Sequence, residues 1–119
     1  MENHLSFGSW GEDQAQLFLE KTGYQIHKRN IRTPYGEIDI IAKKGKVWVI
    51  AEVKTRRSQF FGRPGEAVTS AKQKKIRQST LWWIQESEKT IPELRFDVIE
   101  ILHTSNKTTE IHHIISAFE

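Results

Sequence analysis

Asp39, Glu52 and Lys54 are the residues of this sequence whose types and spacing are best suited to chemistry. Each lies in a segment otherwise rich in Ile, Val and Ala, as in a strand that is at least half-buried. Two carboxylates within about 5 to 8 Å on such a surface repel each other and lose hydration, so a proton or a cation must compensate them. Mg²⁺ suits such a pair, because it accepts one or two carboxylates together with waters and substrate phosphate. Lys54 would then orient an attacking water or stabilise charge that develops on the phosphate.

Whether the two acids meet depends on the turn between their segments. The only turn signal there is Lys44-Gly45-Lys46, so a hairpin is expected. A turn of two residues, Lys44-Gly45 or Gly45-Lys46, places Asp39 and Glu52 on one face, whereas a loop of three residues separates them. The shorter turn is favoured because it also gives one wholly apolar face, formed by Ile38, Ile40, Val47, Val49 and Val53. The alternative to a reactive site is a partly buried ion-pair network among Asp39, Glu52 and Lys54, which would also perturb pKa values.

The net charge of +3 is unevenly distributed along the chain. Residues 28–77 hold fourteen Lys and Arg against four acids, a net charge of +10, and the remaining residues carry −7. A basic central region is typical of a domain that binds a polyanion through one face, since phosphate neutralisation supplies most sequence-independent affinity. With a metal-binding acid pair, this favours phosphodiester hydrolysis. An unevenly charged, solvated surface is the alternative.

Hydrophobic spacing and capping residues predict the elements that must position these side chains. Ser9-x-x-Glu12 makes a capping box for a first helix that Gly23 would end, and Ser70-x-x-Gln73 can cap a second helix that ends near Glu88. The predicted elements are a helix over 9–22, strands over 24–30, 36–43 and 46–54, a loop over 60–66, a helix over 70–88, and strands over 94–102 and 110–115. The order α-β-β-β-α-β-β predicts an α/β protein with a central mixed β-sheet flanked by helices.

Length and composition predict a single domain over residues 1–119, with residues 1–7 as a flexible N-terminal tail. No apolar run approaches the roughly 18 residues of a membrane span and no signal-peptide pattern is present, so we expect a cytoplasmic protein with no membrane partner. The chain has no Cys, and its five His lack metal-ligand spacing, so no zinc site is expected.

Several blocks of the sequence resemble a known family. Asp39 followed by Glu52-Val53-Lys54 resembles the PD-(D/E)xK signature of restriction-endonuclease-like nucleases, with Ile38 where the signature has Pro. Together with further blocks, the chain resembles the uncharacterised YraN-like family, which is similar to archaeal Holliday junction resolvases. These blocks are Gly11-Glu12, Asn30-x-Arg32, Gly36-Glu37-Ile38-Asp39-Ile40-Ile41, Glu52-Val53-Lys54-Thr55-Arg56 and Lys72-Gln73. The resemblance spans about Gly8 to Phe118 and implies a restriction-endonuclease-like fold.

The resemblance also implies roles for individual residues. Asp39, Glu52 and the backbone carbonyl of Val53 would ligate Mg²⁺ or Mn²⁺, and Lys54 would be the catalytic lysine. Glu12 would project towards the same site as a further catalytic residue and metal ligand; its other interpretation is a role in the capping box alone. Gln73 matches a position at which many such nucleases add a polar residue to the site.

Basic residues outside the acid pair are expected to contact phosphates. They are Arg32, Arg56, Arg57, Arg63, Lys72 and Lys75. Arg56, Arg57 and Arg63 surround Phe60-Phe61-Gly62, whose rings would stack on an unpaired base or cover the core, and the two lysines would otherwise form a solvated helical face. Asp97 is either an acid that supports the site or a solvated carboxylate on an edge strand.

These observations lead to the hypothesis of a Mg²⁺- or Mn²⁺-dependent endonuclease that hydrolyses phosphodiester bonds of branched or structured DNA, with RNA as the other nucleic acid considered. Resemblance to resolvases further implies a homodimer, for which an exposed Trp on the second helix would serve. The alternative hypothesis is a non-catalytic module that binds nucleic acid on a nuclease fold.

Overall fold

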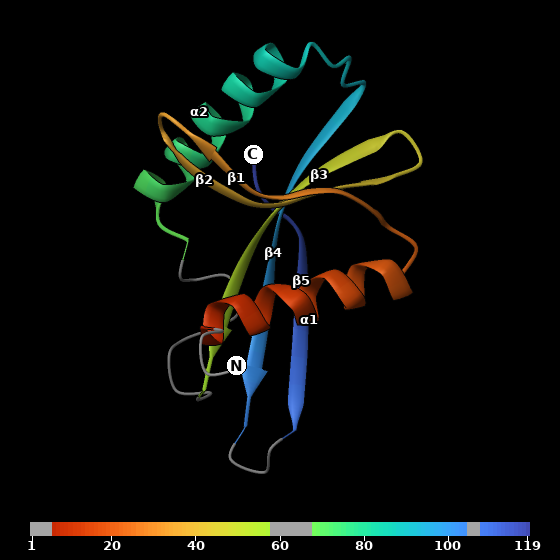
Figure 1. Cartoon of the computed structure of the whole chain (residues 1–119), viewed down its shortest axis with the longest axis vertical. Coiled ribbons are helices and arrows are strands. Elements are labelled where there is room, and N and C mark those ends of the chain that lie inside the picture. Colours follow the sequence, from red (N-terminus) through yellow and green to blue (C-terminus); the bar gives the residue numbers. More distant parts are fainter. Residues whose placement is uncertain (1–5, 58–67, 105–107) are drawn as a thin grey trace.

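The chain folds around a five-stranded mixed sheet with one helix on each face (Figure 1). The computed structural model describes residues 6–57, 68–104 and 108–119. Its elements are α1 (Phe7–Lys21), β1 (Gln25–Thr33), β2 (Gly36–Lys44), β3 (Val47–Arg56), α2 (Ser70–Ser87), β4 (Glu93–His103) and β5 (Thr109–Phe118). The strands lie in the order β1-β2-β3-β4-β5, with β3 and β4 parallel and the other neighbours antiparallel. The predicted fold class and element order are confirmed, and they are consistent with the restriction-endonuclease-like fold.

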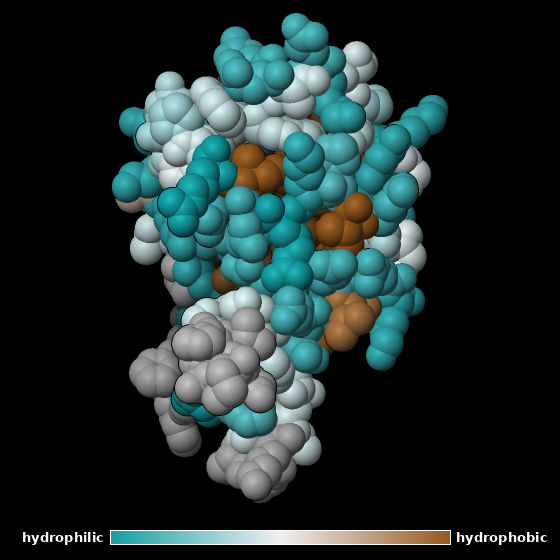
Figure 2. Space-filling model, in the orientation of Figure 1, coloured by the Kyte–Doolittle hydropathy of each residue, from teal (hydrophilic) through white to brown (hydrophobic). Residues whose placement is uncertain are grey.

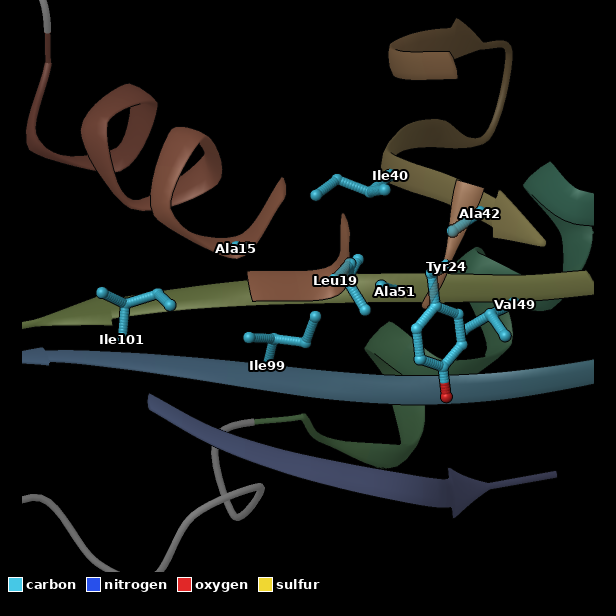
Figure 3. Close-up of a cluster of buried hydrophobic side chains, with 9 residues drawn as sticks. All are labelled: Ala15, Leu19, Tyr24, Ile40, Ala42, Val49, Ala51, Ile99 and Ile101. Carbon is cyan, nitrogen blue, oxygen red and sulfur yellow. The ribbon is translucent and has the colours of Figure 1, made fainter. Parts of the chain in front are cut away.

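Side-chain alternation divides the core into two clusters, one under each helix. Ala15 and Leu19 of α1 pack on Tyr24, Ile40, Ala42, Val49, Ala51, Ile99 and Ile101 (Figure 3). Under α2, Ile76 and Trp83 pack with Ile38, Ile41, Trp48, Ile50, Val68, Phe96 and Val98. The central strands are therefore apolar on both faces, as strands covered on both sides must be.

The capping residues of both helices differ from the predicted ones. Ser6 caps α1 by accepting a hydrogen bond from the Ser9 amide at 2.9 Å, so the capping box predicted at Ser9 is wrong and Phe7 is already helical. Thr69, not Ser70, caps α2 through the Lys72 amide at 3.2 Å. In both cases an earlier hydroxyl-bearing residue than the predicted one serves as the cap. α1 therefore begins at Phe7, two residues before its predicted range, whereas α2 begins at Ser70, as its range predicted. The predicted loop over 60–66, with Arg63, lies outside the described residues, as do residues 1–5 of the predicted tail.

The β2–β3 hairpin has the register predicted from its turn. Lys44 pairs with Val47 across a two-residue turn, in which Gly45 has φ 61°. The ladder runs to Ile40 opposite Ala51, and beyond this pair β2 leaves β3. Ile38 consequently joins the cluster under α2 instead of the apolar face that contains Ile40, so that part of the prediction is wrong.

Asn30 on β1 lies opposite the position at which β2 leaves β3. It lies between the β1–β2 pairs Arg29↔Ile40 and Ile31↔Ile38, and it has φ 54° in the left-handed region that Asn tolerates better than most residues. The hairpin arm beyond this point approaches α2, where Thr33 Oγ1 donates to Ser79 Oγ at 2.8 Å. The block Asn30-x-Arg32 thus contains a backbone irregularity opposite the strand position of Asp39.

Seen with α1 in front of the sheet, the surface is mostly hydrophilic and its hydrophobic patches are separate (Figure 2). No helix among the described residues is both long and apolar enough to cross a membrane.

Gly11 allows α1 to approach β3 closely. A Cβ atom at Gly11 would overlap Thr55 Oγ1 and would lie 2.8 Å from Thr55 Cγ2 and 2.9 Å from Thr55 Cβ. Real Cβ atoms do not make such contacts, so any larger residue would push α1 away from the sheet. The blocks Gly11-Glu12 and Glu52–Arg56 therefore meet at one point.

Gly11→Ala should destabilise the fold by about 1 to 3 kcal/mol through this overlap, measured by denaturant unfolding. Thr55→Ala in the same chain removes the two outer atoms and should recover part of the loss. Gly8→Ala is the control, because its nearest neighbour, Ser6 Oγ, lies 3.8 Å away. Equal stability of Gly11→Ala and Gly8→Ala would contradict the close approach.

Candidate functional site

Asp39 lies where β2 separates from β3. Its Oδ2 accepts a hydrogen bond from the Val53 amide at 2.9 Å, so the side chain takes the place of a backbone partner at the end of the ladder. The N–H and C=O of one strand residue leave the same side of the strand. The Val53 carbonyl is therefore directed to the Asp39 side, and two groups predicted to ligate a metal lie together.

Negative charge accumulates at this point. Burial and the neighbouring charge of Glu52 raise the pKa of Asp39 to about 7, and Glu12 contributes in the same direction, against the opposing effect of the Val53 amide. Asp39 and Glu52 each lie one residue beyond the last pair of the ladder, Ile40↔Ala51, and their carboxyl groups interact with each other. The structure thus brings Asp39 of β2 and Glu52 of β3 together, with Glu12 of α1 close enough for its charge to act on Asp39.

Two lysines share the Glu52 carboxylate, whose side chain is 7% exposed. Lys72 Nζ lies 2.7 Å from Glu52 Oε2, and Lys54 Nζ lies 3.6 Å from the same atom. Burial alone would lower the pKa of Lys72, but its hydrogen bond with Glu52 raises it. Burial, together with the hydrogen bond and charge of Lys72, lowers the pKa of Lys54. Lys72, predicted to contact phosphate, is therefore the cation that compensates Glu52.

Glu12 is held by a residue that the sequence did not single out. Arg29 Nη2 lies 3.4 Å from Glu12 Oε1, and Arg29 Nη1 donates to Asp13 Oδ1 at 2.9 Å and to Gln16 Oε1 at 3.0 Å. Because Ser6 caps α1, the interpretation of Glu12 as a capping residue is wrong. No sequence pattern could identify Arg29, since its role depends on how α1 lies over β1.

The remaining predicted residues lie around this centre in different environments. The side-chain amide of Gln73 donates to the Val68 carbonyl at 3.1 Å. This contact does not test the catalytic role of Gln73, which stays a prediction. Arg56 Nε lies 3.1 Å from Oε2 of the buried Glu100, and the Arg57 guanidinium lies 4.0 Å from the Phe7 ring centroid. Arg32 is 91% exposed, beside Glu37 at 3.8 Å, and Lys75 is exposed on α2. Arg56 is thus engaged internally, whereas Arg32, Arg57 and Lys75 are open to solvent.

The donors present fit a divalent cation bound by few protein ligands. Within residues 6–57, 68–104 and 108–119, no three side chains of His, Asp or Glu are grouped closely enough to hold a metal ion between them. Mg²⁺ and Mn²⁺ need no such group, since one or two carboxylates with water and substrate oxygens suffice. Burial and the charge of Glu52 raise the pKa of Asp39, and a cation beside the two acids would offset both effects.

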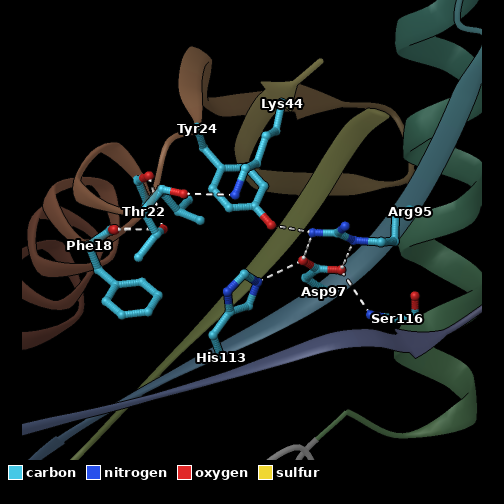
Figure 4. A network of polar contacts seen from close by, with 9 residues as sticks. Phe18, Thr22, Tyr24, Lys44, Arg95, Asp97, His113 and Ser116 are labelled. Atoms are coloured by element: carbon cyan, nitrogen blue, oxygen red, sulfur yellow. Dashed lines mark hydrogen bonds and ion pairs between the residues drawn. The ribbon is translucent and has the colours of Figure 1, made fainter. Parts of the chain in front are cut away.

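A second polar cluster lies around Asp97 on the α1 side of the sheet, and the sequence did not predict its partners Arg95 and His113 (Figure 4). Asp97 is fully buried; Arg95 donates to both of its oxygens at 2.9 and 2.8 Å, His113 Nε2 lies 2.7 Å from Oδ2, and the Ser116 amide donates at 3.0 Å. Arg95 also donates to Tyr24 Oη at 2.6 Å. Burial opposes ionisation, but these hydrogen bonds, His113 first, lower the pKa of Asp97.

The interpretation of Asp97 as a solvated acid on an edge strand is therefore wrong. β4 lies between β3 and β5 and is not an edge strand, so the Asp97 carboxylate is enclosed. Arg95 and Asp97 are two residues apart and therefore lie on the same face of β4. This spacing was the one signal in the sequence that the two side chains could pair. Through His113 and Ser116 the cluster connects β5 to β4, and through Tyr24 it connects the segment before β1 to β4. It is separate from Asp39.

Fold and acid pair together define an α/β protein with a candidate cation site where two strands of a mixed sheet diverge. The profile of the uncharacterised protein family UPF0102 matches residues 11–101, and the chain belongs to this family. It is 42% identical over 118 residues to a UPF0102 protein of Rhodococcus opacus (strain B4), and the alignment covers 99% of this chain and 100% of the relative. It is 46% identical over 117 residues to a UPF0102 protein of Geobacter metallireducens (strain ATCC 53774 / DSM 7210 / GS-15), covering 98% and 95%. The predicted family is confirmed.

Asp39→Asn should stabilise the protein in EDTA at pH 8. The folded-state pKa of about 7 exceeds the ordinary value of 3.8, so wild-type stability falls as the pH rises from about 4 to 7. Asn keeps an acceptor for the Val53 amide without the charge, and a gain of about 1 to 3 kcal/mol at pH 8 that vanishes near pH 4 is expected. Denaturant unfolding across this pH range, with Glu37→Gln as control, measures it. A loss of stability at pH 8 would support the purely structural ion-pair network.

Asp97→Asn should have the opposite effect and destabilise the fold by about 3 kcal/mol at pH 7, because Arg95 loses a buried ionic partner. Since the folded-state pKa is depressed, wild-type Asp97 contributes stability above about pH 4 and loses it as the pH falls. The difference between wild type and variant should therefore narrow in acid. Thermal unfolding from pH 3 to 7 tests this, with Glu93→Gln on the exposed end of β4 as control; a constant difference would contradict it.

Proposed function

We propose that this protein is a Mg²⁺- or Mn²⁺-dependent endonuclease that hydrolyses phosphodiester bonds of branched or structured DNA. The observation that carries the proposal is the carboxylate pair of Asp39 and Glu52, in which burial and mutual repulsion raise the pKa of Asp39 to about 7. Perturbed acids beside a lysine in a basic region are typical of a catalytic site for phosphate chemistry.

Asp39, Glu52 and the Val53 carbonyl would hold the cation, with Glu12 as a further acid on its α1 side. When bound, such a cation polarises a phosphoryl oxygen and lowers the pKa of a coordinated water. Arg29 fixes the Glu12 carboxylate on one side, and the Val53 amide fixes Asp39 Oδ2 on the other. The chain therefore orients its acids before any ligand arrives.

Lys54 would act at the reacting phosphate. Its lowered pKa makes transfer of a proton at Nζ easier than for an ordinary lysine, and in its charged form it stabilises negative charge on the phosphate. Lys72 would release Glu52 as a cation takes its place. The solvent-exposed Arg32, Arg57 and Lys75 would contact the sugar–phosphate backbone, which positions a strand without reading its sequence.

Support for branched or structured DNA as the substrate comes from the sequence resemblance to Holliday junction resolvases. RNA is the alternative substrate in this proposal, and a homodimer is the alternative to a single copy of the chain. Cutting both strands symmetrically would require a second copy, because one site hydrolyses one bond at a time.

One observation favours a second candidate, a nucleic-acid-binding module without catalysis. The 2.7 Å contact of Lys72 with Glu52 already neutralises one of the two acids, so the site is partly compensated without a metal. In that case Lys72 would stay paired with Glu52, and Lys54 would serve only to bind phosphate.

A cleavage and gel-shift panel tests the two candidates. Duplex, single-stranded, flap and four-way-junction DNA are incubated with wild type, Asp39→Asn, Glu52→Gln and Lys54→Ala in Mg²⁺, Mn²⁺ or EDTA, with Glu37→Gln as matched control. We expect metal-dependent cutting that falls about a hundredfold or more in the three site variants and persists in the control. Binding without cutting by any form, equal in EDTA, would favour the non-catalytic module.

A further inference from the structure

A second group of cations lies away from the Asp39 site, at the other end of β3. Lys43 Nζ and Lys89 Nζ lie 5.2 and 5.9 Å from the ring centroid of Trp48, and His27 meets the same ring edge-on at 5.1 Å. These side chains line a cavity of about 230 Å³ with Gln25 and Ile26. We call this cavity the Lys43–Lys89 pocket.

The positive charge of this pocket is not matched by acids. Among the described residues, neither Lys43 nor Lys89 has a carboxylate within ion-pair distance. Burial, then the charges of Lys89, Lys28 and Lys43, lower the pKa of His27, which reflects a positive potential around the ring. Contact with an indole face compensates an ammonium group only weakly compared with an anion.

The room in this pocket also points to a ligand. At about 30 Å³ per water, the cavity holds several waters, which an oxyanion could replace. Trp48 and Glu52 lie on the same face of β3, and the buried Ile50 between them packs under α2, so a strand that reaches from the pocket to Asp39 would pass around α2.

We propose that the Lys43–Lys89 pocket binds a phosphate group, supplied by the nucleic-acid strand whose scissile bond lies at Asp39. The identity of the strand rests on the proposed function, whereas the affinity of the pocket for phosphate does not. Lys43 and Lys89 provide the ionic contacts and Trp48 forms the apolar floor. The pocket would hold the strand at a point away from the reacting bond.

The first arm of the test uses inorganic phosphate and wild-type protein in EDTA. Phosphate should shift the NMR signals of the His27 ring and the Trp48 indole and raise the pKa of His27. Lys43→Gln/Lys89→Gln should lose the phosphate response, whereas Lys43→Arg/Lys89→Arg should keep it. The arginine variant shows whether a loss reflects charge and not misfolding. Failure of phosphate to move these signals in wild type would overturn the proposal.

The second arm measures affinity for four-way-junction and single-stranded DNA in EDTA, in an Asp39→Asn background, across a range of salt concentrations. The glutamine double variant should bind about tenfold or more weakly, and its salt slope should fall by about one to two. Lys21→Gln/Lys46→Gln, which removes the same charge from other exposed sites, should change both less. Equal binding by the two double variants would overturn the assignment to the strand and leave a free phosphate ester as ligand. Because no cleavage is required, this result is independent of whether the protein is a nuclease.

Discussion

Repulsion among partly buried carboxylates at the point where β2 leaves β3 is the constraint around which this structure is arranged. Asp39 is paired with an amide and not with a cation, and its neighbours Glu52 and Glu12 add to the charge that burial already penalises. The lysines answer only part of this demand, since Lys72 and Lys54 both approach a single oxygen of Glu52. A protein selected for stability alone would neutralise Asp39 as well, because unpaired buried charge is among the largest destabilising features known.

Backbone features hold the acids in this costly arrangement. The Gly45-Lys46 turn fixes the register, the irregularity at Asn30 accompanies the departure of β2, and the freed Val53 amide binds Asp39. Gly11 lets α1 lie against Thr55, which brings Glu12 to the same point. Strain and unfavourable charge of this kind concentrate at functional sites, where the remainder of the fold stabilises them. The Asp97 cluster contributes such stabilisation from the opposite side of β4.

Much of this could be predicted from the sequence because it depends on local patterns. Alternation along β2 and β3 and the single turn signal were enough to place Asp39 beside Glu52, and apolar spacing was enough for the order of elements. Contacts between distant elements could not be predicted in the same way. Arg29 binding to Glu12, Lys72 binding to Glu52 and the enclosure of Asp97 all depend on how helices lie over strands. Ile38 was misplaced because alternation assumes a regular strand, which Asn30 and Asp39 interrupt.

Calorimetric titration of Mn²⁺ into the apoprotein tests most directly the proposal that Asp39 and Glu52 form a site for a divalent cation. The account predicts saturable binding of Mn²⁺ by wild type, unchanged by Glu37→Gln and abolished when Asp39→Asn and Glu52→Gln are combined. No binding by wild type, or binding equal in the double variant, would contradict it and leave the two acids as members of an ion-pair network with Lys54 and Lys72.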